Sequence, residues 1–141
     1  MVFRLGGNEA LDCVFVYSVN NDSGSYWHFV TAGLSDLYGD GRVLFPDYAI
    51  PDFAHPSGFG VELSLRVRKR AADTDKDIPS WPIQILHRIA RYMFESGNRI
   101  LPGDNIPWGE SIDKRESLLN NFLTCEDHLL KPVCEFFIAF Y

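Results

Sequence analysis

Two aspartates stand in a glycine-rich stretch where they could bind a metal ion. The segment YWHFVTAGLSDLYGDGR (26–42) places Asp36 and Asp40 directly after a run of aromatic and apolar residues. A calcium loop of the EF-hand type needs oxygen ligands at positions 1, 3 and 5 and a helix before the loop. Counting from Asp36, position 3 is Tyr38, and the preceding run has the pattern of a strand. The stretch is therefore predicted to be a turn, in which the aspartates cap backbone N–H groups or pair with Arg42.

Nucleophile, histidine and phosphate-binding motifs are equally weak. HPSGFG (55–60) differs from the nucleophile elbow G-x-S-x-G because His55 stands where the first glycine is required. His28 lies between Trp27 and Phe29 in a strand-like run, which is typical of a structural, hydrogen-bonded histidine. The histidines lack the i, i+4 spacing of a metal site; they are His28, His55, His87 and His128. With no G-x-G-x-x-G or Walker loop either, no catalytic, cofactor or metal residue is predicted.

The overall charge argues against nucleic acid as a direct partner. Thirteen basic and nineteen acidic residues give a net charge of −6. Such a charge repels a phosphate backbone unless the basic residues are strongly clustered. The densest basic cluster, RVRKR (66–70), ends an apolar run and precedes the acidic stretch AADTDKD. We therefore expect a solvated strand end there, and no direct binding of nucleic acid.

Cysteine usage and hydropathy favour a soluble intracellular domain. Cys13, Cys125 and Cys134 form no C-x-x-C pair and have no close histidine, so they fit neither a disulfide framework nor a zinc site. No window approaches the 18 apolar residues of a membrane span. A length of 141 residues suits one hydrophobic core. We expect one domain over residues 1–141, with free thiols and no membrane contact.

Strand patterns dominate the first half of the chain. LDCVFVYSV (11–19) is rich in β-branched and aromatic residues and ends at a turn cluster, and residues 26–34 predict a second strand that is buried on both faces. In FGVELSLRVRKR (59–70) apolar and polar residues alternate. One face of this third strand is therefore predicted to be buried, and the other, with Glu62, Ser64, Arg66 and Arg68, to be solvated.

A helix is predicted in the second half. In SWPIQILHRIARYMFES (80–96) apolar residues recur at helical spacing, with Ser80 as the N-cap, Gly97 as the stop and His87 on the solvent face. The other segments predict a long loop at 35–58 with a short strand at 43–45, an extended piece in 101–108, a strand or short helix at 117–127 and a strand at 134–141. Together these predict an α/β (α+β) fold with a mixed β-sheet and flanking helices.

Four blocks of the chain, in this order and spacing, resemble the amino-terminal domain of the Suppressor of fused family. They are WHFVTAGLSDLYGDGRV, PSGFGVELSLRVRKR, PSWPIQILHRIARYMFESGN and GDNIPW, and the early segment LGG with EALD is similar as well. The resemblance covers about residues 4–128. It implies that the chain is one lobe of a normally bilobal protein.

The resemblance also implies a function without catalysis. Members of this family are binding proteins of the cytoplasm and also of the nucleus, and they act as negative regulators of Hedgehog signalling. They hold zinc-finger transcription factors of the GLI/Cubitus interruptus type by clamping an extended peptide of SYGHL type between two lobes. Such a peptide binds as an added strand, whose main-chain hydrogen bonds supply affinity and whose side-chain pockets supply specificity. No cofactor is expected.

Three residues are predicted to contact the peptide by the same resemblance. In the family these positions are a tyrosine near the end of the helix, an aromatic residue shortly after it, and the aspartate of the next Gly-Asp pair. They fall here on Tyr92, Ile100 and Asp104, with Ile100 in place of the aromatic residue. Tyr92 offers a flat apolar face and Asp104 can accept hydrogen bonds. The plain alternative is a core-capping tyrosine and a turn aspartate.

Departures from the family pattern set the competing hypotheses. The chain lacks the family's upstream helical segment and its second lobe, and it stops at an apolar strand, so we expect a truncated form with weak or no peptide binding of its own. A second hypothesis is a stand-alone domain that binds another protein, as immunity proteins do. A third is a hydrolase or metal-dependent enzyme that uses His28, Asp36 and Asp40.

Overall fold

The computed structural model describes residues 1–5, 9–22, 24–36, 58–113 and 117–130, and the backbone of 136–140. Several predictions fall outside these residues: the short strand at 43–45, Asp40, Arg42, His55 and Cys134.

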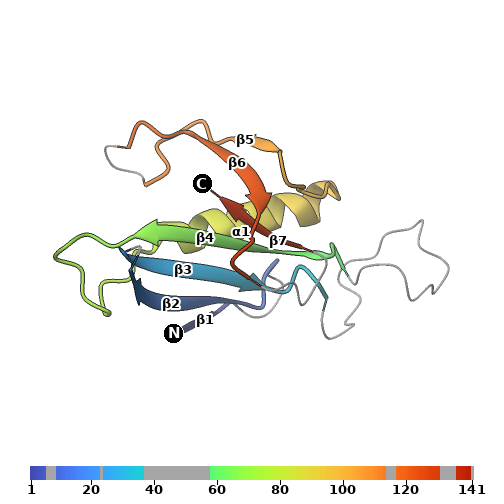
Figure 1. Cartoon of the computed structure of the whole chain (residues 1–141). Helices are drawn as coiled ribbons and strands as arrows, with labels where there is room; N and C mark the ends of the chain where they lie inside the picture. Colours follow the sequence, from blue (N-terminus) through green and yellow to red (C-terminus); the bar gives the residue numbers. More distant parts are fainter. Residues whose placement is uncertain (6–8, 23, 37–57, 114–116, 131–135, 141) are drawn as a thin grey trace.

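A seven-stranded sheet and one helix form the described part of the fold (Figure 1). The elements are β1 (Val2–Arg4), β2 (Cys13–Asn21), β3 (Gly24–Ala32), β4 (Val61–Arg68), α1 (Trp81–Ser96), β5 (Asn105–Pro107), β6 (Asn121–Glu126) and β7 (Phe136–Phe140). The strand order is β1-β2-β3-β4-β7-β6-β5, so β1 and β5 form the two edges. All neighbours are antiparallel except β4 and β7, which run parallel. The predicted mixed sheet is confirmed.

The first hairpin forms where the β-branched and aromatic runs predict it. β2 and β3 pair along their whole length, from Cys13 with Ala32 to Asn21 with Gly24. Because side chains alternate across a sheet, Val16 and Phe29, which are paired, both point into the core. Burial on both faces, predicted for residues 26–34, is confirmed for most of this stretch: the buried residues are Trp27, His28, Phe29, Thr31, Gly33 and Leu34, and the others are half-buried.

The helix α1 packs on one face of the sheet, against β3 and β4 (Figure 1). Its buried side chains recur at helical spacing and include Pro82, Ile85, Leu86, Ile89, Ala90 and Met93. Burying each large apolar side chain contributes about 1.5–3 kcal/mol, which is what holds the helix to the sheet.

Both predicted ends of α1 are found. Ser80 occupies the N-cap position, although its side chain makes no capping hydrogen bond. Gly97 ends the helix at φ 71°, and its N–H donates to the carbonyl of Met93 at 2.9 Å. Glycine adopts this left-handed conformation without steric cost. His87 is only partly exposed, because its Nε2 lies 2.6 Å from Oε2 of Glu9.

The prediction that one face of β4 is solvated is wrong at Glu62 and Ser64; only toward the end of the strand is that face half-buried, at Arg66, or exposed, at Arg68. Glu62 is 3% exposed and Ser64 is fully buried. The carboxylate of Glu62 accepts hydrogen bonds from the Thr31 hydroxyl and from the main chain at the end of β3. Ser64 donates to Asp127 at 2.5 Å. Residues far away in sequence therefore cover the polar face, which explains why the local alternation misleads.

The structure also settles the alternatives left open near the end of the chain. Residues 121–126 form a strand, not a helix, and 136–140 form another strand between β4 and β6. The predicted extended piece in 101–108 is the short strand β5. In the described part of the chain no helix has the length and apolar character needed to cross a membrane.

Candidate functional site

A short connection joins α1 to the edge strand β5 (Figure 1); Tyr92 lies in α1 before this connection, and Asp104 is its last residue. Tyr92 is in the last turns of the helix and its side chain is 51% exposed. The phenolic oxygen accepts a hydrogen bond from Nδ2 of Asn98 at 3.0 Å. In addition, the Ser96 hydroxyl donates to the carbonyl of Tyr92 and accepts from the N–H of Asn98. The ring is thus held in place while much of its face remains open.

Asp104 is fixed through its main chain and through one carboxylate oxygen. Oδ2 accepts from the N–H of Leu101 at 2.8 Å, and the Asp104 carbonyl accepts from the N–H of Thr124 at 2.9 Å. The Asp104 N–H donates to the Thr124 hydroxyl at 2.9 Å. The side chain is exposed, and no described residue donates to Oδ1. This oxygen can therefore accept a hydrogen bond from another molecule.

Ile100, the third predicted site residue, lies below the surface. Its side chain is 4% exposed and belongs to the hydrophobic core. It therefore supports the connection from beneath and offers a partner almost no surface. The structure thus brings Tyr92 and Asp104 to the outside of one short segment, with Ile100 as the anchor between them.

The outer edge of β5 is open beside Asp104. The N–H of Thr124 donates to the carbonyl of Asp104, and the N–H of Trp108 donates to the carbonyl of Asn120 at 2.7 Å, so both ends of β5 bond toward β6. Main-chain groups alternate in direction along an antiparallel strand. Asn105 and Pro107 therefore turn their main-chain groups outward, where no described strand pairs with them. Pro107 has no N–H, which leaves one donor and two acceptors on this edge.

Exposed leucines surround this edge. Leu101 is 47% exposed and Leu123, which pairs with Asn105 across β5 and β6, is 58% exposed. Sequence reasoning did not single out either residue. The signal for Leu123 is the alternation around it in β6, where Phe122 is buried and Leu123 faces outward. The edge thus combines apolar surface with main-chain groups and a carboxylate.

His28 belongs to a buried polar group on the sheet face opposite α1. It is 7% exposed, which agrees with a structural histidine, but no described group bonds its Nε2, which lies 3.8 Å from Oδ2 of Asp127. Burial, and next the charge of Arg66, lower the pKa of His28 to about 4, although Asp127 opposes them. The imidazole is therefore neutral near pH 7 and poorly placed for acid–base chemistry.

Asp127 is the centre of this polar group. Both its oxygens lie 2.8 Å from a terminal nitrogen of Arg66, and its side chain is fully buried. Burial by itself raises the pKa of Asp127, but hydrogen bonds from Arg66 and Ser64 outweigh it, and the pKa is lowered. Among the described residues no three His, Cys, Asp or Glu side chains gather in a way that could hold a metal ion.

The turn predicted after β3 is visible up to Asp36. This residue has φ 45°, a left-handed conformation that Asp tolerates better than most residues. Gly58 lies against it, since a Cβ at Gly58 would come within 2.9 Å of the Asp36 Cβ. Asp36 therefore occupies a tight turn, in agreement with the structural interpretation of this stretch.

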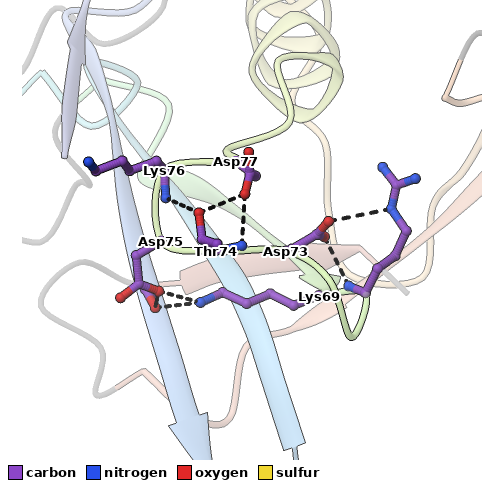
Figure 2. Close-up of polar contacts among 8 residues, drawn as sticks. Lys69, Asp73, Thr74, Asp75, Lys76 and Asp77 are labelled. Atoms are coloured by element: carbon purple, nitrogen blue, oxygen red, sulfur yellow. Dashed lines mark hydrogen bonds and ion pairs between the residues drawn. The ribbon is translucent and has the colours of Figure 1, made fainter.

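The basic cluster at the end of β4 is largely neutralised within the chain. The Lys69 side chain is 5% exposed, and its Nζ lies 4.1 Å from the centre of the Trp27 ring. The same nitrogen donates to Asp75 at 2.8 Å and to the Ser18 hydroxyl at 2.6 Å. Figure 2 shows Lys69 reaching Asp75, with Thr74 bonded to Asp77 on the same loop. The expected solvated strand end is therefore wrong for Lys69. An open pocket of 630 Å³ lies here, but its acidic side chains already pair with its basic ones.

Comparisons with known proteins agree with the geometry of the fold. A family model described as Suppressor of fused protein (SUFU) matches residues 7–136. The chain is 37% identical to the Suppressor of fused homolog of Homo sapiens and 36% identical to that of Mus musculus, each over 135 residues. Each of these alignments takes in 93% of this chain but 27% of the relative. The chain therefore spans about a quarter of the length of the curated relatives it matches.

Two solved structures have the same fold. A chain of the Sufu-Fu complex crystal structure matches with a TM-score of 0.78 and 33% identity, over 96% of this chain and 62% of that one. The crystal structure of Drosophila Suppressor of Fused matches with the same TM-score and identity, over 96% of this chain and 34% of that one.

Proposed function

The chain belongs to the Suppressor of fused family, and we propose that it is a protein-binding lobe that holds an extended segment of a GLI/Cubitus interruptus-type transcription factor beside β5. In this role it acts as a negative regulator in Hedgehog signalling, in the cytoplasm and also in the nucleus. It contacts the transcription factor and not the nucleic acid. One of its structural neighbours is the Sufu-Fu complex, which supports a protein as the partner of this fold.

The open edge of β5, which directly follows Asp104, is the observation that carries the proposal. An extended peptide adds to a sheet edge through main-chain hydrogen bonds, and pockets for alternate side chains select its sequence. Here Asn105 offers an N–H and a carbonyl on that edge. Tyr92 supplies an exposed aromatic face, and Oδ1 of Asp104 accepts from a histidine, hydroxyl or main-chain donor of the peptide.

The lobe by itself is expected to bind weakly. The edge of β5 is three residues long and contains one proline, so it can form few main-chain hydrogen bonds with a peptide. Ordering a flexible peptide costs free energy that a small contact area does not recover. We therefore expect a dissociation constant above about 0.1 mM for this chain with a short peptide.

A titration with an SYGHL-type peptide tests the proposal. Asp104→Arg removes the carboxylate that accepts the hydrogen bond and puts a positive charge in its place, which repels any cationic donor. This substitution should abolish measurable binding. Asp22→Arg changes the net charge equally at an exposed position between β2 and β3 and should leave binding unchanged. Circular dichroism of both variants checks that they are folded. Equal binding by native protein and Asp104→Arg would rule out the assigned site.

A further inference from the structure

Arg99 lies in the middle of the segment that joins Tyr92 to Asp104. Its neighbours fix it on both sides: Asn98 is bonded to Tyr92 and to Ser96, and Ile100 is buried in the core. Further on, the carbonyl of Leu101 accepts from the Thr124 hydroxyl at 2.5 Å. The backbone on which Arg99 stands is therefore held on both sides, within the connection that leads from α1 to β5.

Arg99 has no protein partner for its charge within the described part of the chain. Its Nε is buried and no described group accepts a hydrogen bond from it. The two arginines of α1 differ, because Arg88 pairs with Glu110 at 2.8 Å and Arg91 with Glu9 at 3.4 Å. Arg66 also has a buried Nε without an acceptor, but its terminal nitrogen is bonded to Asp127.

A guanidinium without an ion partner among the described residues favours a negatively charged ligand. A buried N–H without an acceptor costs free energy, and the cost is relieved if the side chain turns outward to a carboxylate. Arg99 gives up no ion pair with a described residue when it does so, whereas Arg88 and Arg91 would each lose one. A guanidinium also binds a carboxylate through two parallel hydrogen bonds, which adds geometric specificity.

We propose that Arg99 is a specificity residue that recognises an acidic side chain in the bound segment. This acidic side chain lies next to the peptide group that donates a hydrogen bond to Asp104. This inference rests on the proposed function, because it assumes that a peptide lies along β5. The preferred segment then carries a carboxylate on one side and a hydrogen-bond donor on the other. Arg99 and Asp104 have opposite charges, so together they also select the direction in which the peptide runs.

A paired substitution scan of the peptide tests the inference. In an SYGHL-type peptide with both ends blocked, each residue flanking the motif is replaced in turn by Asp and by Asn, which have nearly the same shape. NMR titration of the chain then gives the ratio of the two dissociation constants at each position. At one position Asp should bind about threefold to tenfold more tightly than Asn, and added salt should reduce the ratio.

Variants of the chain assign the effect to Arg99. In Arg99→Met, which keeps the apolar stem, the ratio should fall to about 1. Arg99→Lys should keep part of the preference. A ratio near 1 at every position of the native chain, or a preference that survives in Arg99→Met, overturns the inference and leaves the proposed function standing. If no peptide binds at all, both are overturned.

Discussion

Ser35 is joined twice to the buried carboxylate of Glu62. Its main-chain N–H and its hydroxyl both donate to Oε1 of Glu62, at 3.0 Å and 2.6 Å. Two further donors reach the same carboxylate, the Thr31 hydroxyl at 2.6 Å and the N–H of Gly33 at 3.0 Å. The end of β3 and the chain after it are thus tied to β4 by one acidic side chain that is 3% exposed.

Glu62→Gln should destabilise the fold strongly. An amide offers one acceptor oxygen, so its NH₂ group would face donors and the bonds would lose the assistance of the charge. We expect the free energy of unfolding, measured in urea, to fall by about 2–4 kcal/mol. Glu95→Gln on the exposed side of α1 is the matched control and should change it by less than about 0.5 kcal/mol. Equal effects of the two substitutions would contradict the structural role of Glu62.

The buried polar group around Asp127 predicts loss of stability in acid. The pKa of His28 is about 4 in the folded chain, below its ordinary value of 6.5, so the folded state binds this proton less readily than the unfolded state. The contribution of neutral His28 to the stability of the fold is fully present above pH 6.5 and is lost as the pH falls from 6.5 toward 4. The lowered pKa of Asp127 adds a further loss below its ordinary value of 3.8.

Removal of the imidazole should flatten the first part of this pH dependence. Across pH 6.5 to 4 the native chain should lose no more than about 3 kcal/mol through His28, and His28→Gln should lose less over the same interval. His128→Gln is the control, since His128 is 81% exposed. Urea unfolding at several pH values measures both slopes. If His28→Gln keeps the native slope, the buried neutral histidine is not its cause.

The pair formed by Lys69 and Asp75 predicts a recovery in the double variant. Asp75→Asn leaves the ammonium of Lys69, whose side chain is 5% exposed, without its charged partner, and should lower the melting temperature. Lys69→Met keeps the apolar stem of the side chain and leaves Asp75, whose side chain is 72% exposed, with the Ser18 hydroxyl as its remaining donor. The double variant should therefore melt at a higher temperature than Asp75→Asn alone. A loss equal to the sum of the two single effects would show that the residues do not interact.

Local patterns in the sequence predict the helix and the strands, but they do not predict which distant residues pack against their faces. The periodicity of residues 80–96 and the alternation of residues 59–70 depend on neighbouring residues, so α1 and β4 are found close to their predicted ends. The burial of Ser64 depends on Asp127, 63 positions away, which no local pattern contains. Residues 121–126 are too short and too mixed to distinguish a strand from a helix before their pairing with β5 and β7 is known.

The candidate site was predictable in a similar, partial way. The resemblance points to Tyr92 and Asp104, and both are exposed, Tyr92 near the end of α1 and Asp104 directly before β5. It does not indicate that Ile100 is buried, which follows from packing against the core. The sequence gives no reason to select Arg99, because an arginine after a helix is ordinary. Only the absence of an ion partner among the described residues distinguishes it.

Residue-resolved NMR of the chain with an SYGHL-type peptide tests the central claim most directly. If the peptide adds to the outer edge of β5, the amide of Asn105 should shift on titration and exchange more slowly with solvent, together with shifts at Asn98 and Leu101. These changes should be absent in Asp104→Arg. Shifts confined to β1 or to residues 69–77, with Asn105 unchanged, would contradict the proposed binding edge.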